Sequence, residues 1–263
     1  MLPHPEANPE PVPLTAQKRP LLSQGGLWRL PTQSRLSTGA QGLCKCHTNR
    51  MTIRLHHCFV LTAPKAPQAD LLLDLGLNEG SSNIHPGQGT ANRRFFFSNT
   101  MIEFLYVRDA NEASNGRGSR LQLLDRSTEA KASPFGLVVS TAGECEEEPF
   151  PGWRYCPDYL PNGQCFHVGE NSSLLEEPLC ICMPPGFHWV ETRPQSGNLL
   201  MTLTELRVSV PVTHPSQTLR ALSDCECVSL CLNEPHRLEL IFNEGEKGQF
   251  KDMNPQLPII VRW

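Results

Sequence analysis

Residues 84–107 constrain the fold of this chain more than any other stretch. They begin with the polar turn HPGQGTAN, in which Gly87 and Gly89 can adopt backbone angles that side chains forbid. The aromatic run Phe95–Phe97 then predicts a strand. The β-branched and aromatic run Ile102–Val107 predicts its hairpin partner. The stretch therefore predicts a tight polar turn followed by a β-hairpin.

Glu103 is the unusual residue of this hairpin. A carboxylate within an apolar strand costs free energy unless it is paired, protonated, bound to a metal or facing water. Strand alternation places Glu103 on one face with Leu105 and Val107. Two interpretations follow: a glutamate at a solvent-facing edge, or a metal ligand or base directed into a cavity.

The turn motif, followed by an apolar strand and a strand with an early glutamate, resembles the glyoxalase-like domains of the vicinal oxygen chelate superfamily. Upstream, Leu55–Leu61 is similar to the first strand of that superfamily, and His57 fits the place of its early histidine. The resemblance is clearest over residues 53–108. It implies an α+β fold in which paired βαβββ modules form a curved mixed sheet around a cavity.

The N-terminal part differs in composition from the rest. Residues 1–50 are rich in proline and show no sustained period, so they predict a disordered extension. Their arginine and serine content is typical of transit peptides, but a simpler hypothesis makes Met51 the natural start. Residues 51–140 predict the first module, with a strand over 52–62 and a helix over 66–77.

The C-terminal half predicts two further parts. Residues 141–198 form a connecting insert rich in proline and aromatic residues, whose segment 150–161 suggests either a lid over the sheet mouth or a structural loop. Residues 199–263 predict a second, degenerate βαβββ module. That prediction depends on two strands, 204–211 and 237–242, whose patterns repeat those of the first module.

Composition narrows the class of function. Of the 263 residues, 39% are hydrophobic, and no apolar run is long enough to cross a bilayer, which predicts a cytoplasmic protein without a membrane partner. The net charge of −4 provides no basic face for nucleic acid. The eleven cysteines and the lack of a signal-peptide pattern suggest small buried side chains in a reducing compartment, with adventitious metal binding as the alternative.

The resemblance implies a divalent ion bound between the two modules. Carried over by position, His57 and Glu103 are the ligands of the first module and Glu239 that of the second, with Glu103 also the catalytic residue. Mixed histidine and carboxylate ligands suit Fe, Mn, Zn or Ni. The second module has Thr204 where a histidine is expected, so the set is incomplete, and a purely structural Glu239 is the alternative.

The polar turn is a second candidate site. His85, Gln88, Asn92 and Arg94 predict binding of an anionic or carbonyl group, because Arg94 supplies forked donors. In the alternative interpretation, glycine and asparagine residues only shape the turn, and the arginine meets solvent or carboxylates.

Three functional hypotheses follow from these features. The first is a metal-assisted lyase, isomerase or dioxygenase acting on a small oxygenated molecule. The second is a module of the same fold that binds a small molecule without turnover. The third is a dimerising structural protein, with a homodimer as the expected partner. An intact ligand set favours the first, a cavity with Arg94 and aromatic side chains but no metal the second, and a filled cavity the third. We also expect His57 and Glu103 to face one cavity.

Overall fold

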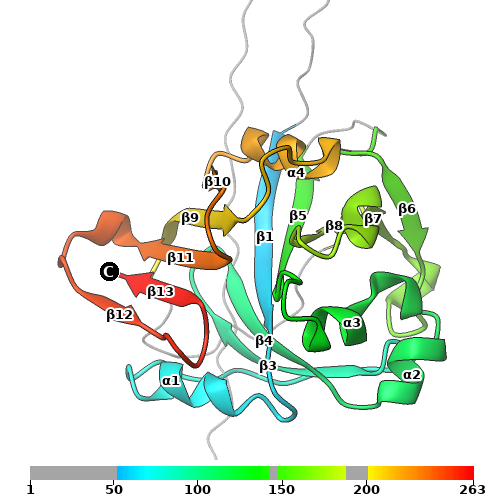
Figure 1. Ribbon diagram of the computed structural model, residues 1–263, viewed down its shortest axis with the longest axis horizontal. Helices are drawn as coiled ribbons and strands as arrows, with labels where there is room; N and C mark the ends of the chain where they lie inside the picture. Colours follow the sequence, from blue (N-terminus) through cyan, green and yellow to red (C-terminus); the bar gives the residue numbers. More distant parts are fainter. Residues whose placement is uncertain (1–51, 143–146, 188–200) are drawn as a thin grey trace, which may run out of the picture. The chain divides into compact units, whose positions relative to one another are not determined.

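The computed structural model describes residues 52–142, 147–187 and 201–263, so the predicted disordered extension lies outside the described residues. Strands dominate and helices are short, which makes the fold α+β (Figure 1). The strands are β1 (Thr52–Leu61), β2 (Ile84–His85), β3 (Thr90–Phe96), β4 (Met101–Val107), β5 (Phe135–Ala142), β6 (Gly152–Tyr155), β7 (Phe166–Gly169), β8 (Leu179–Cys182), β9 (Leu203–Val210), β10 (Val228–Leu232), β11 (Arg237–Phe242), β12 (Phe250–Asp252) and β13 (Ile259–Arg262). The helices are α1 (Asp70–Leu73), α2 (Ala110–Asn115), α3 (Leu123–Thr128) and α4 (Gln217–Ala221).

Eight strands form one strongly curled mixed sheet in the order β2-β3-β4-β1-β5-β8-β7-β6. Its two halves repeat one pattern. The first strand of each half pairs in parallel with the last, and the remaining pairs are antiparallel. Strands β1 and β5 join the halves by antiparallel pairing at the centre. The prediction of a curved mixed sheet is therefore confirmed.

The second copy of the pattern lies in β5–β8 and not in residues 199–263, where it was predicted. Described residues 201–263 form a separate five-stranded sheet in the order β10-β9-β11-β13-β12. Its strand β11 is antiparallel to β9, whereas β4 is parallel to β1, so Glu239 and Glu103 do not occupy matching strands. The prediction relied on the alternation of apolar residues in two strands, and every half-buried strand shows such alternation. Much of the predicted insert is instead the second half of the sheet.

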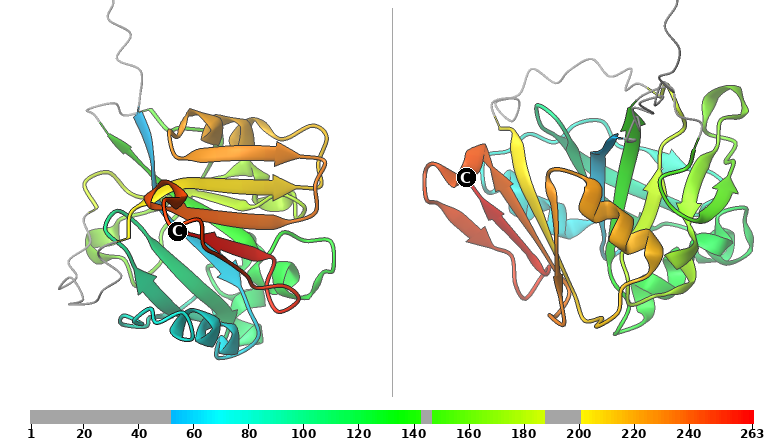
Figure 2. Two further views of the ribbon diagram at one scale, coloured as in Figure 1. Left: turned by 90° about the vertical axis from the view of Figure 1, so that its left-hand side faces the viewer. Right: turned by 90° about the horizontal axis from the view of Figure 1, so that it is seen from above.

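The two faces of the eight-stranded sheet have different neighbours. On one face, Cys58, Val60 and Phe104 belong to a core shared with Leu206 and Leu240 of the five-stranded sheet. Side chains of the opposite face, among them Phe59, Leu105 and Val138, form a second cluster. Figure 2 shows the five-stranded sheet, in yellow to red, beside the curled sheet. Where these strands are buried on both faces, at Cys58–Leu61 of β1 and Phe135–Val139 of β5, their sequences are continuous runs without charged or polar side chains.

Polar contacts also hold the two sheets together. The side chain of Asn99 donates from Nδ2 to the carbonyl of Leu203 at 2.9 Å and accepts from the Leu203 amide at 2.9 Å. Beside it, the hydroxyls of Ser98 and Thr202 are 2.7 Å apart. The turn between β3 and β4 is thereby joined to the start of β9.

The helix predicted over residues 66–77 is much shorter than expected. It consists of one 3-10 turn, Pro67–Ala69, followed by the single α-helical turn α1. Gly76 adopts a φ of 79°, a left-handed conformation that ends the helical turn. Because so little helix forms, the five-stranded sheet provides most of the cover for the face of the eight-stranded sheet that carries Val60 and Phe104.

Candidate functional site

A cavity of about 370 Å³ lies on the face of the eight-stranded sheet that carries Phe59 and Val138. Its volume falls in the range of small-molecule sites. Most of the lining is apolar or aromatic, contributed by Phe59, Ile84, Leu105, Leu121, Leu123, Val138, Tyr155, Tyr159, Leu160, Pro161, Phe166, Leu179, Ile181, Met183 and Phe187. The remaining lining side chains are polar and come from the first half of the sheet: His57, Asn83, His85, Gln88 and Glu103.

His57 and Glu103 meet because β1 and β4 are parallel neighbours. In their register Phe59 lies opposite Glu103, and His57 shares the cavity face with Phe59. The Nε2 atom of His57 is 3.9 Å from Oε1 of Glu103. Both side chains are buried and both line the cavity, so the prediction that they face one cavity is confirmed.

A bulge in β1 brings His56 against His57. The pairing with β5 shifts between Leu55 and His57, so that His56 is the extra residue of the strand. The Nδ1 atoms of the two rings are 2.7 Å apart, a distance that requires one ring to donate a proton to the other. Burial lowers the pKa of His57 well below its usual value, and the neighbouring His56, Arg94 and His85 lower it further. His57 is therefore neutral at physiological pH.

The polar turn supplies the next part of the wall. His85 and Gln88 both line the cavity, as predicted for this candidate site. Nε2 of Gln88 donates to the Thr90 hydroxyl at 2.8 Å, and the Tyr159 hydroxyl donates to Oε1 of Gln88 at 2.8 Å. Gly89 is required here, because a Cβ atom would lie 2.5 Å from the Asp109 carbonyl oxygen.

Asn92 and Arg94 lie behind the wall rather than in it. Neither is among the lining residues, and both are almost fully buried. Asn92 Oδ1 accepts from the Asn83 amide at 2.7 Å, and Arg94 donates to the carbonyl and hydroxyl oxygens of Ser81 at 2.6 and 2.7 Å. Both residues thus position the segment that precedes β2, and neither lines the cavity for which a ligand contact was predicted.

Arg94 also has an electrostatic role. It lies directly opposite Glu103 in the pairing of β3 with β4, so the two opposite charges share one face of the sheet. Its positive charge contributes, after burial, to lowering the pKa of His85 to about 4. The polar end of the cavity therefore combines a charge-balanced glutamate with two neutral histidines.

Glu239 does not join this site. It lies on β11 in the other sheet, where its carboxylate pairs with Arg262 and, at 3.4 Å, with Arg207. The alternative of a structural Glu239 therefore agrees with its contacts. The prediction that Glu239 shares a metal site with His57 and Glu103 is wrong. The strand pattern of the first module repeats in β5–β8, whereas Glu239 lies on β11 of the other sheet.

The donors around the cavity do not fit the predicted Fe, Mn, Zn or Ni site. The second half of the sheet turns Val138, Leu179 and Ile181 toward the cavity, and none of these side chains can bind such an ion. Within the described ranges, no group of three or more histidine, cysteine, aspartate or glutamate side chains could hold a metal ion.

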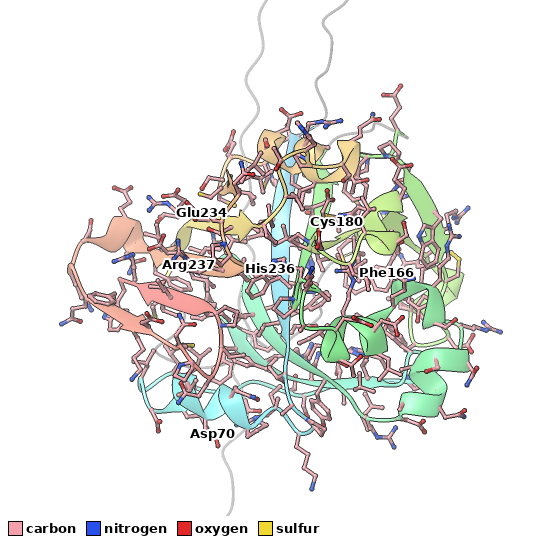
Figure 3. All side chains as sticks on the ribbon, viewed as in Figure 1. Asp70, Phe166, Cys180, Glu234, His236 and Arg237 are labelled. Carbon is pink, nitrogen blue, oxygen red and sulfur yellow. A yellow bond between two sulfur atoms is a disulfide. The ribbon has the colours of Figure 1, made fainter. Side chains whose placement is uncertain are left out.

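Part of the cavity wall was not assigned from the sequence. Tyr155, Tyr159, Leu160 and Phe166 come from the predicted insert, and Figure 3 labels Phe166 on β7. The signal was the aromatic and proline-rich composition of residues 150–161. Within that segment, Gly152–Tyr155 forms the edge strand β6, and Tyr159, Leu160 and Pro161 after it line the cavity.

A disulfide holds this part of the wall in place. Cys156 follows β6 and Cys165 precedes β7, so antiparallel pairing brings them together, and their sulfurs are bonded. The interpretation of all cysteines as free buried side chains is wrong for this pair. It agrees with Cys58, Cys180 and Cys182, which are free and buried.

Comparison with known proteins identifies a shared fold but no function. No family model and no curated protein matches the chain. A hypothetical protein from Staphylococcus aureus has a TM-score of 0.51 at 10% identity, covering 80% of this chain and 98% of its own. A hypothetical protein, BH1468 from Bacillus halodurans C-125, has a TM-score of 0.37 at 13% identity and covers 52% of this chain and 97% of its own.

The similarity to the Staphylococcus aureus protein extends beyond the curled sheet. Residues 52–187 make up only about half of this chain, so coverage of 80% includes part of the five-stranded sheet.

No helix in the described part of the chain is long and apolar enough to span a membrane.

Proposed function

We propose that this protein binds a small, largely apolar molecule in the cavity of the eight-stranded sheet. The observation that carries this proposal is the cavity itself: about 370 Å³, with apolar and aromatic walls and polar groups gathered at one end. Such a distribution is typical of small-molecule sites, in which a few polar groups orient an otherwise apolar ligand.

We further propose that the sheet is a pair of modules of the vicinal oxygen chelate type. Three features support this: the strand order repeated in its two halves, the helical segment between β1 and β2, and the placement of His57 and Glu103 on the first and last strands of one half. The second half contributes apolar side chains at the cavity, so the proposed module is a binding protein rather than a metal-dependent enzyme.

The alternative of a purely structural protein predicts a filled cavity. Here the space beside Val138 is open, although the opposite face of the same sheet is closely packed against the second sheet. A protein whose only role is structural gains stability by filling such a space, since cavities cost free energy. The open cavity therefore favours binding.

The proposal can be tested with N-phenyl-1-naphthylamine, an uncharged dye whose fluorescence rises in apolar surroundings. We expect saturable binding to the protein and a loss of affinity of about tenfold or more in Val138→Phe, whose added ring occupies the cavity. Leu174→Phe is the matched control, because Leu174 is 48% exposed and does not line the cavity.

Circular dichroism should show that both variants are folded, and Ile181→Phe serves as a second cavity-filling change. Equal dye binding by the wild-type protein and by both cavity-filling variants would overturn the proposal, as would the absence of saturable binding to the wild-type protein.

A further inference from the structure

We propose that Cys225 and Cys227 form a dithiol site that hydrogen peroxide oxidises to an internal disulfide. The two residues lie just before β10 of the five-stranded sheet, so this reaction goes beyond the binding of a small molecule in the cavity of the eight-stranded sheet. Three features support it: the distance between the two sulfur atoms, the backbone that holds them, and the charge and exposure around them.

The two sulfur atoms are already close to each other. The Sγ atoms of Cys225 and Cys227 are 3.9 Å apart, a distance at which one thiol can donate a hydrogen bond to the other. Both cysteines are free, in contrast to the bonded pair Cys156–Cys165. Since a disulfide has a sulfur–sulfur distance of about 2.0 Å, each sulfur has to move by only about 1 Å. Rotation about the two Cα–Cβ bonds provides a movement of that size.

Backbone hydrogen bonds hold the two residues in a tight turn. The amide of Val228 donates to the Cys225 carbonyl at 3.0 Å, which closes a four-residue turn. The amide of Leu206 donates to the Cys227 carbonyl at 2.7 Å. This turn joins the 3-10 helix Leu222–Asp224 to the edge strand β10. Because the main chain is fixed on both sides, the thiols stay neighbours and the reaction between them is intramolecular.

The contact between the two thiols makes the pair reactive. The hydrogen bond from Cys227 lowers the pKa of Cys225 to about 7, and backbone hydrogen bonds of Cys227 and Leu55 act in the same direction, against the effect of burial. A thiolate is therefore populated at neutral pH, and the thiolate is the form that attacks an oxidant. Burial instead raises the pKa of both Cys58 and Cys180 to about 12, so those thiols stay protonated.

Exposure and charge favour a small, uncharged oxidant. Cys225 is only 2% exposed, whereas Cys227 is partly exposed. Glu226 between them is exposed, and its negative charge opposes the ionisation of Cys225. Glutathione disulfide is large and anionic, so this carboxylate repels it. Hydrogen peroxide is small and neutral, and it reaches the pair without that cost.

The reaction balances with hydrogen peroxide as the oxidant. The proton of Cys227 passes to the Cys225 thiolate, and the Cys227 sulfur attacks one peroxide oxygen. The O–O bond breaks, hydroxide leaves and Cys227 becomes a sulfenic acid. The hydroxide removes the Cys225 proton to give water, and the Cys225 sulfur attacks the sulfenic sulfur. The S–S bond forms as a second hydroxide leaves and takes up a solvent proton. The two sulfurs together lose two electrons, and the peroxide is reduced to two water molecules.

Mass spectrometry of one tryptic peptide tests the proposal. Residues 221–237 form a peptide that contains three cysteines, Cys225, Cys227 and Cys231. The full-length protein is treated with hydrogen peroxide at neutral pH, then denatured with N-ethylmaleimide present to label free thiols, and digested without reduction. Before peroxide we expect a label on every cysteine of this peptide. After peroxide we expect a label on Cys231 alone and an internal disulfide between the other two, which dithiothreitol reverses.

Single variants assign the bond to this pair. Cys231→Ser should still form the disulfide. Cys225→Ser should form none within the peptide, and its Cys227 should lose maleimide labelling about tenfold or more slowly during peroxide treatment, because the hydrogen-bonded thiolate is gone. The wild-type protein and Cys231→Ser test the bond even if Cys225→Ser fails to fold.

Three results would overturn the proposal. The first is full labelling of the wild-type peptide after peroxide treatment. The second is a disulfide that includes Cys231. The third is faster oxidation of the pair by glutathione disulfide than by hydrogen peroxide at equal concentration, which would show that Glu226 and the burial of Cys225 do not select a small, uncharged oxidant.

Discussion

Glu177 accepts two hydrogen bonds from Ser216. The backbone amide of Ser216 donates to Oε1 and its hydroxyl donates to Oε2, each at 2.6 Å. Glu177 is buried just before β8, and Ser216 is the N-cap of α4, so the contact joins the curled sheet to the C-terminal part of the chain. Asn171 donates a third hydrogen bond to the same carboxylate, at 3.1 Å.

We expect Glu177→Gln to destabilise the protein by about 1–3 kcal/mol, because an amide cannot accept all three hydrogen bonds and leaves a buried donor unsatisfied. Urea unfolding followed by circular dichroism measures the change. The matched control is Glu176→Gln at the exposed neighbouring position, which should shift stability by less than about 0.5 kcal/mol. Similar stabilities for the two variants would show that the Glu177 contacts are energetically unimportant.

The Cys156–Cys165 disulfide should control ligand affinity. It encloses Tyr159, Leu160 and Pro161, three residues of the cavity wall. Opening a loop of this length costs stability of about 2–3 kcal/mol in the chain-entropy model. We expect Cys156→Ser/Cys165→Ser to lower the melting temperature and to weaken binding of N-phenyl-1-naphthylamine several fold.

Cys231→Ser is the control for this change, since Cys231 is free and lies on β10 away from the cavity. A reducing agent should weaken dye binding to the wild-type protein and leave the double variant unchanged. Unaltered affinity after reduction of the disulfide would mean that strand pairing alone holds the wall.

Stability should fall in mildly acidic solution. Burial, with a further effect of Arg94, lowers the pKa of His85 from 6.5 to about 4. Between these values the unfolded chain binds the proton and the folded protein does not. The stability is therefore fully present above pH 6.5 and is lost as the pH falls toward 4. Burial of His56, whose pKa is also lowered to about 4, acts in the same direction.

We expect His85→Gln to reduce this acid-dependent loss by an amount on the order of 1–3 kcal/mol. Urea unfolding at a series of pH values across this range measures it. His214→Gln, at an exposed position, should follow the wild-type profile. Parallel profiles for all three proteins would show that His85 titrates equally in the folded and unfolded states.

Local pattern predicted the first half of the sheet well. The runs around His57 and Glu103 became β1 and β4, because alternating apolar residues and tight glycine turns act over short distances. The same local information put these two side chains on the cavity face. It failed for the helix over 66–77, where only one 3-10 turn and one α-helical turn formed before Gly76.

The sequence by itself therefore determined the central strands, the polar turn and the faces on which His57 and Glu103 lie, whereas only the family resemblance predicted that their strands are neighbours. Only the tertiary structure decided that Glu239 lies in another sheet, that Tyr159 completes the cavity wall and that Cys156 bonds to Cys165. The reason is that strand alternation specifies which face a side chain occupies but not which distant strand lies beside it. Which strands lie side by side depends on packing between segments far apart in the chain, and a single sequence does not display that packing.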